Sequence, residues 1–208
     1  MKSIETVGKT TEEAIQNALK ELNAAEDKVK IDILEEGSKG FLNIFGNKPA
    51  RVRATLKRDY KGEATQFLRS VLNTMNIKAE IHVKEADDEL RVNIEGPNMG
   101  VLIGYRGETL DSLQYLLSLI INKNHDEVYK RVILDTANYR HNRQETLKRL
   151  ALKMGDKVKK NGRTVKLEPM NPYERRIIHS TLQNNEFVTT HSEGDEPFRK
   201  VVIELKKA

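Results

Sequence analysis

The segment Gly104-Tyr105-Arg106-Gly107 has residue types and a spacing that suit the sugar–phosphate backbone of a nucleic acid. Glycine has no Cβ, so another backbone can approach it closely. A helix is expected after Gly107, and the free N–H groups at its start favour an anion. The alternative is an ordinary turn between two helices that needs glycine for its own backbone, and the motif by itself does not separate the two.

A second group of residues, Arg175, Arg176 and His179, lies in a segment whose apolar residues repeat at helical spacing. Arg175 and His179 are four residues apart and therefore share one face of the helix, roughly 40° apart. Guanidinium suits the geometry of phosphate, so we predict that both arginines contact it. Two roles stay open for His179, namely contact with the ligand and a hydrogen-bonded position at the edge of the core.

Basic residues are concentrated in the last third of the chain. Residues 136–208 carry 16 basic and nine acidic side chains, whereas residues 59–135 carry nine and 13. Residues 137–163, which have a helical pattern, hold nine basic and two acidic side chains, with Arg140 and Arg143 among them. A solvated helix face is the alternative, but this excess favours an anionic partner such as nucleic acid.

The composition excludes several functional classes. The chain has 32% charged residues, a mean hydropathy of −0.63 and no cysteine, so disulfides, thiolate metal sites and cysteine nucleophiles are excluded. The five histidines lack metal-ligand spacing, and no P-loop or Ser/His/Asp pattern is present. We therefore expect no enzyme, no cofactor and no metal. The start has no apolar signal region and no apolar stretch could span a bilayer, so we expect a cytoplasmic protein.

The elements that must position these residues form an α+β fold of three small domains. Residues 1–58 predict β-α-β-β, with a capping box at Thr10 and Glu13. Residues 62–135 predict α-β-β-α-α-β, with the glycine motif between the two consecutive helices. Residues 137–208 predict a long helix, a short strand, a helix capped by Asn171 and a terminal hairpin, which together give a helix and a small three-stranded sheet.

One loop in the first domain is apolar where a loop is normally polar. We predict that it contacts a protein partner, and the alternative is that it packs into its own domain or a self-associating interface. The side chains concerned are Phe41, Leu42, Ile44 and Phe45.

The order of elements around the glycine motif resembles a type II KH domain over residues 62–135. The string MNPYERRIIHSTL resembles the helix that defines the Arg-x3-His (R-x3-H) domain, here residues 137–208. Together with KGFLNIFG in residues 1–58, the whole chain resembles the Jag family, the SpoIIIJ-associated RNA-binding proteins also called KhpB.

This resemblance implies a bacterial cytoplasmic protein that holds single-stranded RNA and regulates gene expression after transcription. It also implies a small single-KH protein as a partner and links to cell shape and to the membrane-insertion machinery; a homo-oligomer is compatible with it. The residues expected to bind RNA are Gly104, Tyr105, Arg106, Gly107, Arg140, Arg143, Arg175, Arg176 and His179.

Two other functions compete with RNA binding. A protein-interaction adaptor of the membrane-insertion machinery, with little RNA binding, is favoured by the net acidic residues 59–135 and by the apolar loop. A ribonuclease would need a catalytic motif, and we find none.

Overall fold

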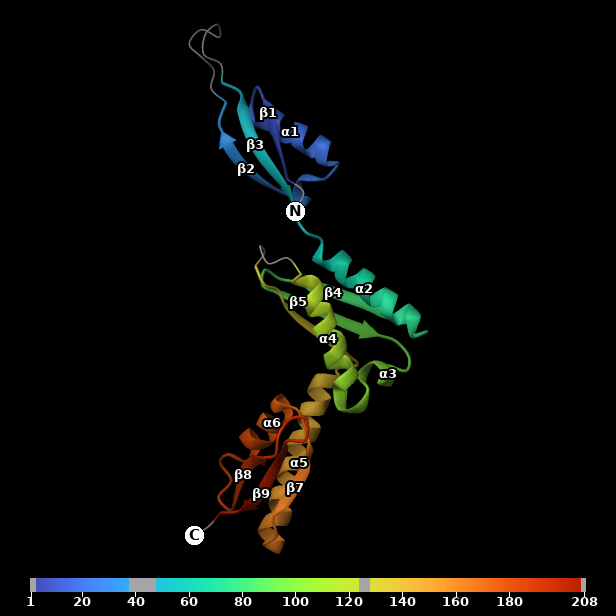
Figure 1. The fold of residues 1–208 in the computed structure, drawn as a ribbon, viewed down its shortest axis with the longest axis vertical. Helices are drawn as coiled ribbons and strands as arrows, with labels where there is room; N and C mark the ends of the chain where they lie inside the picture. The colour runs from blue at the N-terminus through green and yellow to red at the C-terminus, as the bar shows by residue number, and fades with distance from the viewer. Residues whose placement is uncertain (1–2, 38–47, 124–127, 207–208) are drawn as a thin grey trace. The chain divides into compact units, whose positions relative to one another are not determined.

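The computed structural model describes residues 3–37, 48–123 and 128–206, and the chain divides into two compact units, Met1–Glu63 and Ala64–Ala208. Within the described residues, helices and strands are mixed and the strands form three separate three-stranded sheets (Figure 1). The α+β fold predicted from the sequence is therefore confirmed. The predicted loop around Phe41, Leu42, Ile44 and Phe45 lies outside the described residues.

The first unit is one helix packed on an antiparallel sheet. Its sheet has the order β1-β3-β2, and β3 pairs antiparallel with both neighbours. The helix buries Ala14, Ala18 and Leu22, which lie in one apolar cluster with β2 and β3 residues. In chain order the elements are β1 (Ser3–Gly8), α1 (Thr11–Leu22), the short η1 (Glu26–Lys28), β2 (Val29–Glu35) and β3 (Ala50–Leu56).

The capping box predicted at the start of α1 is formed by residues close together in the sequence. Thr10 caps the helix by accepting a hydrogen bond from the backbone N–H of Glu13 at 3.2 Å. The Glu13 carboxylate reaches back and accepts from the backbone N–H of Lys9 at 2.7 Å. These bonds satisfy N–H groups that the first turn of a helix leaves unpaired.

The second unit begins with a mixed sheet covered by helices. The sheet has the order β4-β5-β6, in which β4 and β5 are antiparallel and β5 and β6 are parallel. Strand β4 starts at Glu80, which pairs with Glu95, the last residue of β5 before Gly96 and Pro97. The elements are α2 (Tyr60–Thr74), which crosses the unit boundary, β4 (Glu80–Glu85), β5 (Glu89–Glu95), α3 (Gly100–Ile103), η3 (Tyr105–Gly107), α4 (Glu108–Ile121) and β6 (Arg131–Thr136).

The second unit continues with a long helix and a second antiparallel sheet of order β7-β9-β8. The predicted cap at Asn171 is confirmed, because its side chain accepts a hydrogen bond from Glu174 N–H at 2.9 Å at the start of α6. Gly162, with φ 67°, ends α5. The elements are α5 (Tyr139–Asn161), β7 (Val165–Pro169), α6 (Pro172–Leu182), β8 (Val188–Glu193) and β9 (Lys200–Leu205).

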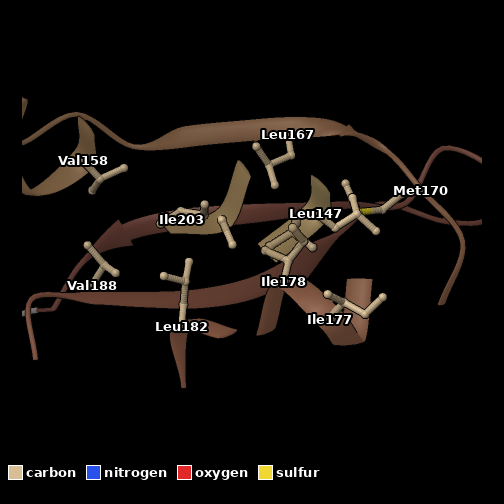
Figure 2. Close-up of a cluster of buried hydrophobic side chains, with 11 residues drawn as sticks. Leu147, Val158, Leu167, Met170, Ile177, Ile178, Leu182, Val188 and Ile203 are labelled. Carbon is tan, nitrogen blue, oxygen red and sulfur yellow. The ribbon is translucent and has the colours of Figure 1, made fainter. Parts of the chain in front are cut away.

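One hydrophobic core joins α5, α6 and this sheet (Figure 2). Ile178 of α6 is fully buried beside Leu147 of α5, and Ile203 of β9 is fully buried in the same cluster. Burial of such side chains contributes roughly 1.5–3 kcal/mol each to folding. The core therefore fixes which faces of α5 and α6 remain for a ligand.

No helix in residues 3–37, 48–123 or 128–206 combines the length and the apolarity that a transmembrane span needs.

Candidate nucleic-acid interface

The glycine motif forms the connection between α3 and α4. Gly104 and Gly107 have φ values of 70° and 89°, in the region that favours glycine. A Cβ at Gly104 would overlap the Thr109 hydroxyl, and one at Gly107 would lie 2.6 Å from Tyr139 Cε1. Both glycines are thus required by the backbone and packing of the protein itself. This is what the alternative interpretation, a turn between two helices that needs glycine for its own backbone, predicts.

Arg106, between these glycines, is held against the end of β7. Its guanidinium forms an ion pair with Glu168 and donates to the Pro169 carbonyl at 3.3 Å. It also lies over the Tyr105 ring, 4.8 Å from its centroid. Tyr105 itself is 66% exposed. The loop therefore presents an aromatic ring to solvent, with the arginine behind it.

Arg140 joins α5 to the preceding sheet and helix. Its Nε donates to the Leu134 carbonyl at 2.9 Å, and its two terminal nitrogens donate to Asp111 Oδ1 at 2.8 Å and to Gln114 Oε1 at 3.1 Å. The guanidinium predicted to bind RNA thus has three hydrogen-bond partners within the protein.

Arg143, one helical turn further along α5, is bonded to α6. Its Nε donates to Glu174 Oε1 at 2.7 Å, and the two side chains are only 22% and 7% exposed. Charge-assisted hydrogen bonds of this length are among the stronger ones in proteins. Arg140 and Arg143 together fix the start of α5 between α4 and α6.

The two arginines of α6 have different surroundings. The Arg175 side chain is 12% exposed, pairs with Glu196 and donates to the Met170 carbonyl at 3.2 Å. Arg176 is exposed and lines an open pocket of about 390 Å³ together with Gln183 and Lys206. Of the two, Arg176 is therefore the one positioned to meet a ligand directly.

His179 has both ring nitrogens occupied. Nδ1 lies 2.7 Å from Thr190 Oγ1, and Nε2 lies 2.8 Å from Ser192 Oγ. Burial lowers the pKa of the imidazole below its usual value, and the charges of Arg175 and His191 lower it further. A neutral imidazole accepts from one hydroxyl and donates to the other. This geometry matches the hydrogen-bonded role, one of the two left open by the sequence.

Solvent-facing cations lie elsewhere on α5, among the nine basic residues of 137–163 but outside the set predicted to bind RNA. Their spacing of four, four and three residues places them along one face of the helix, and all are exposed. This spacing was present in the sequence and could have identified them. We call this set the basic stripe; it consists of Arg149, Lys153, Lys157 and Lys160.

Comparisons with known proteins match all three parts of the chain. Family models match as Jag N-terminus over residues 6–56, KhpA/KhpB KH domain over 61–133 and R-x3-H domain over 145–205. The chain is 51% identical to RNA-binding protein KhpB of Clostridium symbiosum, covering 100% of this chain and 93% of that protein. It is 40% identical to RNA-binding protein KhpB of Bacillus subtilis, with 100% of both covered.

A more distant relative matches only in part. RNA-binding protein KhpB of Lactiplantibacillus plantarum is 37% identical over 141 residues, which are 68% of this chain and 44% of that protein. The printed names of all three relatives describe proteins that bind RNA.

Proposed function

This chain belongs to the KhpB family, and from that premise we propose that it is a binding protein for single-stranded RNA rather than an enzyme. The observation that carries this proposal is the basic stripe of α5, four exposed cations on one helix face within the residues that match the R-x3-H domain. Cations so arranged neutralise successive phosphates and release counterions, which supplies most sequence-independent affinity.

The other residues predicted to bind RNA have two kinds of role in this proposal, contact with RNA and support of the structure. Tyr105 offers its exposed ring for stacking on a base, and Arg176 contacts phosphate from the start of α6. Arg140, Arg143, Arg175 and His179 act by holding the elements in place, because each has partners inside the protein. The two glycines let the loop adopt its shape.

We further propose that residues 1–58, 62–135 and 137–208 are separate domains of a cytoplasmic regulator that acts on RNA after transcription. The matches to three family models, over 6–56, 61–133 and 145–205, support this division. The links to cell shape and to membrane-protein insertion remain part of the proposal.

A specific surface favours a protein partner as a second function. Tyr115, Leu116 and Leu119 lie on one face of α4 and are 64%, 49% and 52% exposed. Contiguous apolar side chains on a surface are typical of a protein contact. We propose that this face binds a small single-KH protein or a second copy of this chain, which would combine the adaptor role with RNA binding.

A titration of fluorescein-labelled decauridylate tests the proposed function. We expect the full chain to bind, and a variant without residues 1–57 to keep its affinity within roughly twofold, because the basic stripe lies in the second unit. This cut retains Arg58, whose guanidinium is bonded to Glu63 at the start of α2. Loss of binding by the shortened chain, with its thermal unfolding intact, would place the RNA site in the first unit.

A further inference from the structure

A small pocket lies where the glycine loop, the start of α5 and the start of α6 meet. Its volume is about 120 Å³, and its lining combines arginine and tyrosine side chains from all three elements. We call it the junction pocket. The lining residues that matter for its chemistry are Arg106, Tyr139, Arg140, Arg143, Tyr173 and Glu174.

The lining of the junction pocket has an excess of positive charge. Asp111 and Glu174 are its two carboxylates, and each is matched by an arginine, Arg140 at 2.8 Å and Arg143 at 2.7 Å. The third arginine, Arg106, pairs with Glu168, whose side chain is 69% exposed and does not line the pocket. Water screens so exposed a partner. The lining therefore holds three arginines against two carboxylates, and the carboxylate that pairs with Arg106 lies outside it, which favours an anion in the pocket.

Tyr139 brings an unused hydrogen-bond donor to the same place. Its phenolic oxygen is buried and has no hydrogen-bond partner among the described residues. Burial, the largest effect, raises the pKa of the phenol, so the group is neutral and carries its proton at ordinary pH. A buried hydroxyl without an acceptor is costly, which favours any ligand that supplies one. The ring packs against Gly107, so the donor is fixed beside the loop.

We propose that the junction pocket binds one phosphodiester group of single-stranded RNA, with Tyr139 Oη donating a hydrogen bond and Arg106 supplying the charge. This inference rests on the proposed function and names a site for it. The Tyr173 ring, 62% exposed at the start of α6, is available to the neighbouring base. The RNA thereby contacts the glycine loop and the start of α6 as one continuous site.

Tyr139→Phe tests the inference because it removes only the hydroxyl and keeps the ring against Gly107. A hydrogen bond to a charged group corresponds to roughly a tenfold change in affinity, so we expect Tyr139→Phe to bind labelled decauridylate about tenfold more weakly. The Tm of Tyr139→Phe should not fall below that of wild type, since the lost hydroxyl has no hydrogen-bond partner among the residues that the structure describes. Tyr129→Phe is the matched control, a tyrosine that is 65% exposed and precedes β6, and it should bind like wild type.

Uridine monophosphate is titrated in parallel to distinguish an RNA chain from a free nucleotide as the ligand of the junction pocket. Weaker binding of decauridylate by Tyr139→Phe, and by Arg106→Gln as a second variant, supports the inference. An unchanged affinity of Tyr139→Phe for decauridylate overturns the inference. If Tyr139→Phe at the same time binds uridine monophosphate more weakly, the pocket is a site for a free nucleotide. In that case wild type and Tyr129→Phe still bind RNA and the proposed function stands. If wild type does not bind decauridylate at all, the proposed function fails first.

Discussion

Replacing Arg149, Lys153 and Lys157 by alanine lowers the affinity for single-stranded RNA about 100-fold at 0.1 M salt, by the counterion-release relation. These three exposed residues of the basic stripe lie on the same face of α5. Each phosphate contact on a single strand contributes about 0.7 to the slope of log affinity against log salt, so the slope flattens by roughly two units. Alanine is a strong helix former, so α5 remains folded.

The measurement is a titration of labelled oligoribonucleotide at several salt concentrations. The matched control is Lys9→Ala, Lys20→Ala and Lys28→Ala, which removes three exposed cations from the first unit. This control should keep both the affinity and the slope of wild type. A stripe variant with the wild-type slope would mean that the cations of α5 only solvate the helix, and the adaptor function would then gain support.

Glu174→Ala destabilises the second unit by about 3 kcal/mol, the lower end of what breaking a buried ion pair costs. The Glu174 side chain is 7% exposed, and its removal leaves the guanidinium of Arg143 at a site only 22% exposed to water. For a unit of this size, about 3 kcal/mol corresponds to a fall in Tm of roughly 10 °C. Thermal unfolding followed by circular dichroism measures this directly.

Two further variants show whether burial is the cause. Glu193 forms an ion pair with Lys166 at 2.8 Å, but both side chains are about half exposed, so Glu193→Ala should leave the Tm nearly unchanged. The double variant Arg143→Leu with Glu174→Leu should recover much of the loss, because it removes the buried charges as a pair. A Tm of Glu174→Ala equal to that of Glu193→Ala would show that the Arg143–Glu174 pair does not hold α5 to α6.

The order of elements and the helix caps could be predicted because their signals are local. Thr10 and Asn171 each cap a helix through a bond to the residue three positions on, and Gly162 ends one by its own backbone conformation. Helical and alternating apolar patterns predicted the helices and strands for the same reason. Such signals need only the neighbouring residues.

The partners of the predicted RNA-binding arginines could not be predicted in the same way. Arg140 bonds to Asp111, 29 residues away, and Arg143 bonds to Glu174, 31 residues away. Guanidinium fits a carboxylate as well as a phosphate, so residue type alone does not choose between them. Whether an arginine binds a carboxylate of the protein or a phosphate of RNA depends on which helices pack together. The packing of α5 against its neighbours pairs Arg140 and Arg143 with carboxylates and leaves the cations of the basic stripe exposed.

The most direct test of RNA binding by the second unit is photo-crosslinking to 4-thiouridine-containing RNA, followed by mass spectrometry of the linked peptides. We expect linked peptides from α5, from the loop that carries Tyr105 and from the start of α6, because these carry the basic stripe, the exposed ring and Arg176. Competition with unlabelled RNA should remove these links. Links confined to residues 3–57, or none that unlabelled RNA displaces, would contradict the account.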